Sequence, residues 1–244
     1  MEKTKWGRRT ISAYGGGKIV HPNDLYFMVD MYDQQSWRSG SSYWEDKTGL
    51  TVSDNVYVSH SQFDSDGYPI FDKVAPCKIY WTGAETKLLQ NNFTVQFWWK
   101  TTGAAGTGST GGSNSYHTLL GGVGDGQVIM LSAGSRVGWW GRISGASKYH
   151  FTAIDASYFP VGTWRFTTFL KTNSGSYWYL DDEIISTDLN YTASLDNSAI
   201  GTFLLGRDDN YVPNGVLPVI MVYNRALTDE EIKSNYRSGK SRFK

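Results

Sequence analysis

Residues 215–244 read GVLPVIMVYNRALTDEEIKSNYRSGKSRFK, and this stretch joins an apolar strand to one short helix. Thr228 suits the N-cap of that helix, and Glu231 stands three residues later, as in a capping box. Leu227 and Ile232 have the spacing of a hydrophobic staple, which fixes the direction in which the chain enters a helix. These local patterns agree with each other and predict a helix that begins just after Thr228.

Glycine and proline mark the boundaries of these two elements. Gly239 predicts the C-terminal stop of the helix. Pro218 has no N–H to donate to a sheet ladder and interrupts the alternation of the strand. Leu217, Ile220 and Val222 can share one face only if the strand has a bulge near Pro218. We therefore expect a bulged strand and then a helix that ends near Gly239.

The order of motifs in this stretch resembles the C-terminal region of laminin-G-like jelly rolls, which belong to the concanavalin A-like lectin/glucanase group. The resemblance rests on a glycine, an apolar strand, Tyr-Asn-Arg-Ala-Leu at 223–227, Thr-Asp-Glu-Glu-Ile at 228–232 and Asn-Tyr at 235–236. It implies a jelly-roll sandwich of two antiparallel sheets with one short C-terminal helix. It also implies that the first and last strands are neighbours.

A second segment, near the N-terminus, is similar to laminin-G-like proteins of bacteriophage particles. An apolar run at residues 25–32 is followed by polar, glycine and tryptophan positions in the order found in those proteins. The matching positions are Asp30, Ser36-Trp37, Gly40, Trp44, Asp46 and Thr48-Gly49. This resemblance implies a protein of a phage particle.

Composition favours a single all-β domain. The chain has 244 residues, of which 40% are apolar and 15% aromatic, enough for a sizeable core. Residues 91–100 alternate cleanly, with Phe93, Val95, Phe97 and Trp99 on one face and Thr94, Gln96, Trp98 and Lys100 on the other. We predict a basic N-terminal arm at residues 1–18 and one jelly-roll domain at residues 19–244.

Charge is concentrated at the two ends of a chain whose formal net charge is zero. Residues 1–20 carry five Lys or Arg and one Glu, a net +4, and residues 225–244 carry six against three, a net +3. The remaining residues therefore carry −7, because +4 and +3 must be balanced. We expect the arm to anchor to an acidic partner surface, unless it is only a solvated tail. The anchoring residues would be Lys3, Lys5, Arg8 and Arg9.

The sequence contains no recognisable secretory signal, no apolar run long enough to span a membrane, and one cysteine, Cys77. Synthesis in a host cytoplasm and a final location in the virion are the corresponding expectations. Membrane partners are not expected. Nucleic-acid partners are not expected either, because basic residues gather at the ends of the chain and not among the aromatic ones.

Catalytic groups of the glucanase type do not occur in the sequence. Such enzymes present acidic residues at alternate positions of one strand, with acid and nucleophile about 5 Å apart. No Glu-x-Asp-x-Glu is present, and Asp181-Asp182-Glu183 falls at a predicted hairpin turn. The prediction is that the protein is not an enzyme and needs no cofactor.

Metal binding is left open. The four histidines have no pair at ligand spacing. Calcium is possible, because many relatives bind it at the sandwich edge, but no ligand is assigned. The possible oxygen donors, for which a place in a turn is the commoner explanation, are Asp125, Asp155, Asp208, Asp209 and Asn210.

The best candidates for ligand binding are aromatic. Trp139 and Trp140 are consecutive, so one of them must point away from the core if they lie in a strand. An exposed indole can stack on a sugar, and Arg142, Tyr149 and His150 could add polar contacts. The alternative is that both sheet faces are covered by loops or a neighbouring subunit. The same two interpretations, an exposed ring that binds a ligand or a ring that is covered, apply to Trp98-Trp99 and to Trp178-Tyr179.

The leading functional hypothesis is a non-enzymatic structural protein of a tailed phage, in particular a capsid decoration protein on the particle surface. Its partners would be other virion proteins of the capsid or tail, and copies of itself. The alternative is a tail- or fibre-associated, lectin-like adsorption module that binds a surface glycan.

Overall fold

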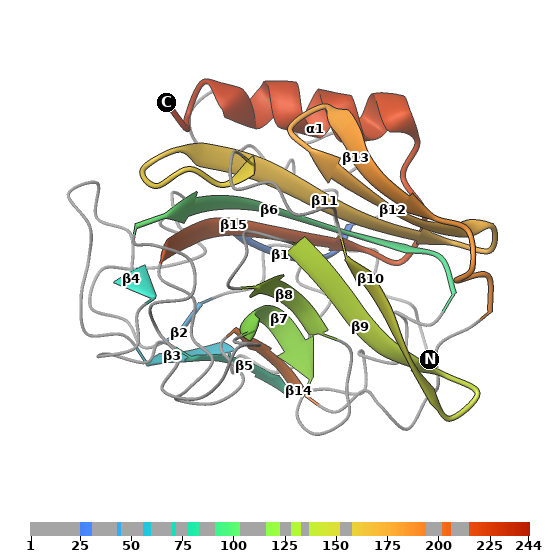
Figure 1. Cartoon of the computed structure of the whole chain (residues 1–244). Helices are drawn as coiled ribbons and strands as arrows, with labels where there is room; N and C mark the ends of the chain where they lie inside the picture. The colour runs from blue at the N-terminus through green and yellow to red at the C-terminus, as the bar shows by residue number, and fades with distance from the viewer. Residues whose placement is uncertain are drawn as a thin grey trace, which may run out of the picture.

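The computed structural model describes about half of the chain. The described ranges are 25–30, 43–44, 56–59, 70–71, 78–82, 91–102, 116–122, 128–132, 137–151, 158–193, 202–205 and 215–244. These residues form two antiparallel sheets and one C-terminal helix that lies outside them (Figure 1). The predicted all-β sandwich with a C-terminal helix is confirmed.

The first sheet has seven strands and lies next to the helix (Figure 1). Its order is β1-β15-β6-β11-β12-β13, with β4 also paired to β15. The strands are β1 (Leu25–Asp30), β4 (Ile70–Phe71), β6 (Phe93–Thr101), β11 (Trp164–Thr172), β12 (Gly175–Leu180), β13 (Glu183–Asp188) and β15 (Gly215–Tyr223). Since β1 pairs with β15, the expected neighbourhood of first and last strands is confirmed.

The second sheet has eight strands in the order β10-β9-β8-β7-β14-β5-β3-β2. Its strands are β2 (Tyr43–Trp44), β3 (Val56–Ser59), β5 (Lys78–Thr82), β7 (Tyr116–Gly122), β8 (Val128–Ser132), β9 (Val137–Ile143), β10 (Ala146–Phe151) and β14 (Thr202–Leu205). The β9–β10 hairpin therefore forms one edge of this sheet (Figure 1).

Alternation along β6 assigns its two faces as predicted. Phe93 contacts Phe169 with ring centroids 5.8 Å apart, and Phe169 in turn stacks on Trp139 of the second sheet. The Phe93 face is therefore the inner one. Trp98 lies on the other face, where it stacks on Phe243 and Tyr236. The outer face of the seven-stranded sheet is thus covered by the C-terminal segment.

The helix α1 (Asp229–Lys240) begins as the local pattern predicts. The Thr228 side chain accepts from the backbone N–H of Glu231, and the Glu231 carboxylate accepts from that of Thr228. This reciprocal pair is a capping box. Leu227 and Ile232 are both buried in the cluster between helix and sheet, as the staple requires.

The end of the helix differs from the prediction. Gly239 lies inside α1, which continues to Lys240 and is capped by Ser241. A Cβ at Gly239 would lie 2.6 Å from the Trp98 indole nitrogen. Glycine is required here because the indole packs directly against the helix backbone, and not because the helix stops.

The bulge predicted near Pro218 is present. The register of β15 against β6 shifts between Val216 and Val219, so that Pro218 sits in the irregular part of the strand. Beyond the shift, Val219, Met221 and Tyr223 join the cluster under α1. The proline is accommodated without breaking the sheet.

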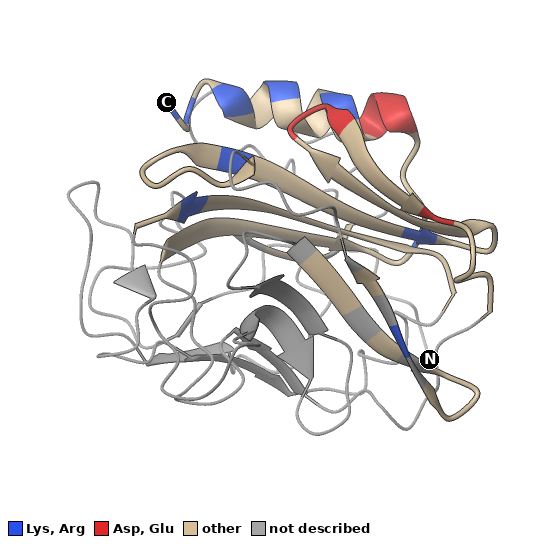
Figure 2. Ribbon diagram, viewed as in Figure 1, with Lys and Arg blue, Asp and Glu red and all other residues tan. Residues whose placement is uncertain are grey.

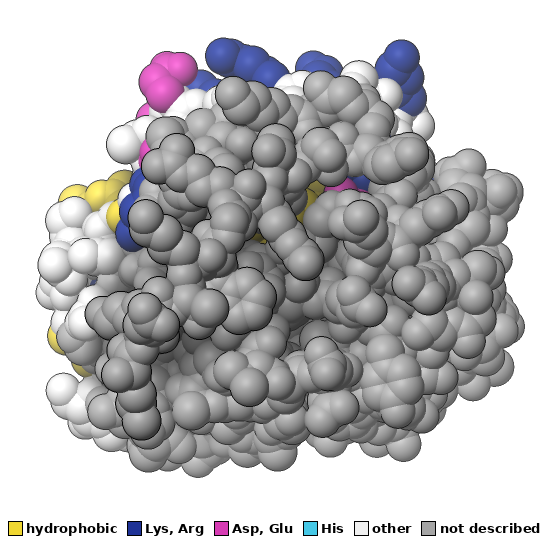
Figure 3. All heavy atoms as spheres, turned by 180° about the vertical axis from the view of Figure 1, so that it is seen from behind, with side chains coloured by type: hydrophobic (Ala, Val, Ile, Leu, Met, Phe, Trp, Pro, Cys, Tyr) yellow, Lys and Arg dark blue, Asp and Glu magenta, His cyan; other side chains and the backbone are white. Residues whose placement is uncertain are grey.

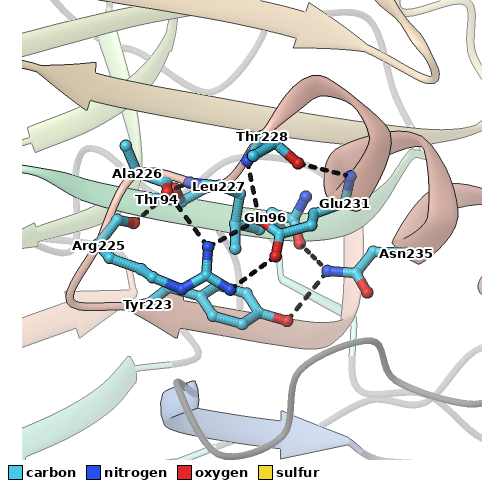
Figure 4. Close-up of polar contacts among 9 residues, drawn as sticks. All are labelled: Thr94, Gln96, Tyr223, Arg225, Ala226, Leu227, Thr228, Glu231 and Asn235. Atoms are coloured by element: carbon cyan, nitrogen blue, oxygen red, sulfur yellow. Dashed lines mark hydrogen bonds and ion pairs between the residues drawn. The ribbon is translucent and has the colours of Figure 1, made fainter.

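Polar side chains fix the position of α1 over the sheet (Figure 4). The Asn235 amide donates to Gln96 Oε1 at 2.7 Å and to the Tyr223 hydroxyl at 3.0 Å. Arg225 forms a bidentate ion pair with Glu231, with N–O distances of 2.7 and 2.9 Å. Buried polar groups with matched partners allow one orientation of a helix where apolar packing alone would allow several.

The C-terminus is tied to the first strand by a buried ion pair. Arg242 donates two hydrogen bonds to the Asp30 carboxylate at 2.6 and 2.9 Å. The Asp30 side chain is 0% exposed and that of Arg242 is 7% exposed. The remaining charges of α1 separate by sign, with acidic residues in the first turn and basic residues in the last turn (Figure 2). Asp229, Glu230, Arg237 and Lys240 are exposed, and charged side chains gather along the helix side of the molecule in the space-filling view (Figure 3).

Candidate functional site

The predicted ligand-binding residues all fall on the β9–β10 hairpin. The two strands pair from Ile143 and Ala146 at the turn to Gly138 and Phe151 at the far end. Ser144 and Gly145 form the turn with φ angles of 52° and 76°. Two successive left-handed residues are typical of the tight turns whose twist matches a hairpin. The hairpin therefore has one defined register.

Trp139 lies on the inner face of the hairpin. Its ring stacks on Phe169 of the other sheet, with centroids 5.5 Å apart and planes at 12°, and meets Tyr191 edge-on. Gly141 is beneath the same indole, since a Cβ there would lie 2.3 Å from it. Trp139 is 1% exposed. It is a core residue, which corrects the expectation that this ring stacks on a sugar at the surface.

His150 is also buried, opposite Trp139 in the strand register. Its Nδ1 lies 2.7 Å from the Ser176 hydroxyl on β12 and its Nε2 lies 2.9 Å from the Ser186 hydroxyl on β13. The Trp178 indole donates to the His150 carbonyl at 3.2 Å. With both ring nitrogens used between the sheets, His150 does not offer a polar contact to a ligand at the surface. This part of the predicted site is corrected as well.

Burial lowers the pKa of His150 to about 4, although the nearby Asp188 carboxylate acts in the opposite direction. An imidazolium is costly to bury because it loses its hydration. The side chain is therefore neutral at pH 7, and one ring nitrogen carries a proton while the other accepts. A serine hydroxyl can donate or accept, so both contacts are satisfied.

The strand register of the hairpin places three predicted residues close together, namely Trp140, Arg142 and Tyr149. Trp140 pairs with Tyr149, and Arg142 pairs with Ser147 at the next position of the same parity. Their side chains lie outside the described residues. The register thus brings three of the five predicted ligand-binding residues together along the hairpin, while the other two belong to the core.

The other aromatic pairs are covered on both sides. Trp98 is buried under α1, and Trp99 is buried on the inner face, where its indole donates to Thr101 Oγ1 at 3.0 Å. Trp178 and Tyr179 are likewise buried. Both faces are therefore covered for these pairs, as the alternative required, but the cover is helix α1 and the facing sheet and not loops or a neighbouring subunit.

The acidic turn between β12 and β13 is structural. Asp181 takes a left-handed φ of 58° in this two-residue turn. Its carboxylate accepts from Arg165 at 2.7 Å and from the backbone N–H of Phe166 at 3.0 Å. The carboxylate thus holds the turn against β11, as expected for a turn residue. Asp182 completes the turn.

Lysine and serine residues that the sequence did not single out complete the polar part of the inner face. Lys171 is 0% exposed, burial lowers its pKa, and its ammonium donates to the Thr172 carbonyl at 2.7 Å. It pairs with Ser176 in the register, and Ser176 pairs with Asp188. Lys171 stands two residues after Phe169, and the alternation of a strand therefore predicts that both side chains point inward. No comparable sequence pattern indicates the inward position of Ser176 or Ser186.

The predicted metal-binding and partner-anchoring residues lie largely outside the ranges that the structure describes. Within the described residues, no group of three or more His, Cys, Asp or Glu side chains is arranged to hold a metal ion. The five possible calcium donors and the basic arm with Lys3, Lys5, Arg8 and Arg9 lie outside the described ranges. No helix in the described part of the chain is long and apolar enough to cross a membrane.

The sequence profile of the concanavalin A-like lectin/glucanases superfamily, in its laminin-G form, matches residues 79–233. This is more than half of the chain. The chain therefore belongs to this superfamily. A comparison with curated proteins found no sequence relative.

Solved structures with a similar fold include receptor-binding domains of neurotoxins. The binding domain of botulinum neurotoxin serotype D has a TM-score of 0.65 at 15% identity, over 88% of this chain and 52% of that chain. The binding domain of botulinum neurotoxin DC has a TM-score of 0.62 at 14% identity in complex with rat synaptotagmin II, over 89% and 52% of the two chains. In complex with SialylT the values are 0.65 and 13%, over 90% and 52%.

At this level of identity the similarity shows the fold alone. The chain spans about half the length of these binding domains. The fold of a concanavalin A-like, lectin-type domain is therefore established for this chain, and its ligand is not.

Proposed function

We propose that the chain is a non-catalytic, lectin-type module that binds a glycan through the outer face of the β9–β10 hairpin. The observation that carries the proposal is the hairpin register, which pairs Trp140 with Tyr149. Alternate residues of a strand face opposite sides of a sheet. Trp139 and His150 occupy the inner face, which leaves Trp140, Arg142 and Tyr149 as the candidates for the outer one.

This set has the chemistry of a sugar site. An aromatic ring can stack on the apolar face of a sugar, and a guanidinium can form bidentate hydrogen bonds to a carboxylate. Two of the similar structures support a binding role, since they show the binding domain of botulinum neurotoxin DC in complex with SialylT and with rat synaptotagmin II. Because a sialylated glycan offers both a sugar face and a carboxylate, it is the first probe to use.

A glycan array tests the proposal directly. The intact chain is expected to bind at least one class of sialylated glycan. The Trp140→Ala variant is expected to lose about tenfold or more in affinity, which corresponds to about 1.4 kcal/mol. Lys148→Ala is the matched control, because Lys148 is exposed on the same hairpin and pairs with Gly141 of the inner parity. An array without any bound glycan would contradict the proposal.

The absence of catalysis is part of the same proposal. A retaining glycosidase needs two carboxyl groups about 5 Å apart on one face of the site. The carboxylate of Asp181, the best placed by sequence, is instead occupied by Arg165 and the Phe166 backbone. We expect no release of reducing sugar from any glycan that the array identifies. Sugar release that a single Asp or Glu substitution abolishes would show that the chain is an enzyme.

A place on a phage particle, as a capsid decoration protein or in the tail, stays a prediction. It is supported by the resemblance of residues 25–49 to phage laminin-G-like proteins and by the basic arm at residues 1–18. A binding module exposed on a particle would serve adsorption, so the two functions are compatible. Deletion of residues 1–18 should abolish occupancy on purified particles, and normal occupancy would rule out anchoring by the arm.

A further inference from the structure

His150 joins the two sheets at the edge where the β9–β10 hairpin lies. The imidazole comes from β10 of the eight-stranded sheet, and both of its partners, Ser176 and Ser186, come from the seven-stranded sheet. The Trp178 indole crosses the same seam in the opposite direction to reach the His150 carbonyl. Three hydrogen bonds from one residue thus connect the hairpin to the facing sheet.

The surroundings of the imidazole favour the neutral form. Tyr191 stacks on it with ring centroids 6.2 Å apart, and the side chain is 3% exposed. Among the described residues, the Asp188 carboxylate on β13 acts on the imidazole and raises its pKa. Lys171 on β11 pairs in the register with Ser176, one of the two partners of the ring, and Lys148 on the same strand as His150 is exposed. Asp188 also accepts two hydrogen bonds from Asn190.

We propose that His150 is a proton-sensitive tie, so that acidification releases the β9–β10 hairpin from the facing sheet. The serine hydroxyls can still accept from a protonated ring, but they cannot replace the water that a buried imidazolium has lost. Release exposes the ring to solvent and removes that cost. The inference does not depend on which ligand the hairpin binds.

The size of the effect follows from proton linkage. An exposed histidine has a pKa of about 6.5, whereas His150 in the closed seam has a pKa of about 4. The open form therefore binds the proton more tightly than the closed form does, and it becomes more favourable as pH falls from 6.5 to 4. The ratio of open to closed forms is expected to rise about 50-fold between about pH 7 and about pH 4.5.

Exchange of the Trp178 indole proton, followed by NMR on the full chain, measures this opening. After correction for intrinsic exchange, its protection factor should fall about 50-fold from pH 7 to pH 4.5. The Trp99 indole is the internal control, since it is buried and donates to Thr101 within one sheet. It should exchange more slowly than the Trp178 indole at both pH values, because opening of the hairpin releases Trp178 and only global unfolding releases Trp99. Equal protection factors for Trp99 and Trp178 at both pH values would overturn the inference.

The His150→Gln variant separates the titration from other effects of acid. A glutamine amide can donate to one serine and accept from the other without binding a proton, so Trp178 protection should then be the same at both pH values. A fall as large as in the parent chain would overturn the inference. If the variant does not fold, an NMR titration of the His150 ring in the parent chain decides, because a pKa of 6.5 or higher would exclude the tie.

Discussion

Gly239 shows how one residue can mislead a sequence-based prediction about an element. Glycine near the end of an amphipathic pattern predicts a helix stop, and the cap residues at the other end were predicted correctly. The structure uses this glycine differently, since the Trp98 indole lies where a Cβ would be. That contact joins positions 141 residues apart in the chain, and no local pattern contains it.

Gly239→Ala sets two effects against each other. Alanine favours a helix interior by about 1 kcal/mol over glycine, but the added methyl would lie 2.6 Å from a buried indole nitrogen. Trp98 cannot move aside, because Phe243 and Tyr236 stack on it. We expect overpacking, typically about 1–3 kcal/mol, to win and the variant to be less stable in urea unfolding. Ser234→Ala on the same helix is the control, and a Gly239→Ala protein more stable than the parent would contradict this account.

His150 predicts a pH dependence of stability with a defined sign. Its pKa in the folded protein, about 4, is below its unfolded value of 6.5. The unfolded chain therefore binds the proton first as pH falls below 6.5, and folding stability decreases until about pH 4. The loss reached by pH 4 is on the order of 3 kcal/mol, at about 1.4 kcal/mol per pKa unit. Urea unfolding from pH 7 to pH 4 should show this loss in the parent chain beyond that in His150→Gln, and parallel curves would disprove it.

The sequence predicted where helix α1 begins, but it did not predict which residues of the sheet the helix contacts. Alternation in β6 predicted that Gln96 and Trp98 share a face, which is correct. The same alternation placed polar residues on that face and did not indicate which part of the chain packs against it. The cover is α1, through the hydrogen bond from Asn235 to Gln96, a pairing that depends on the tertiary fold.

The Asp30–Arg242 pair tests how strongly this element closes the sandwich. Removal of one partner leaves the other charge buried, which typically costs about 3–5 kcal/mol. Arg242→Met should therefore destabilise the chain by that amount in urea unfolding. The double variant Arg242→Met, Asp30→Leu should recover a substantial part of the loss, since no buried charge remains. Additive losses would indicate that the two side chains act independently.

At the scale of the whole molecule, the resemblance predicted the class of fold and the neighbouring first and last strands, while Pro218 and the interrupted alternation around it predicted the bulge in the last strand. The sequence could not decide which indole of Trp139 and Trp140 faces inward, because strand alternation has no absolute direction. Packing decided it, since Trp139 fits over Gly141 and against Phe169. Two of the five predicted ligand-binding residues, Trp139 and His150, are therefore core residues. Trp140, Arg142 and Tyr149 are the candidates for the outer face of the hairpin.

The central claim is that a glycan binds on the Trp140 side of the hairpin. The most direct measurement is a titration of the ten tryptophan indole N–H signals with a sialylated oligosaccharide, with assignments from single Trp→Phe variants. A glycan bound there should shift the Trp140 signal in a saturable way while the buried Trp139 signal does not move. No saturable shift at Trp140, or a shift confined to other tryptophans, would contradict it.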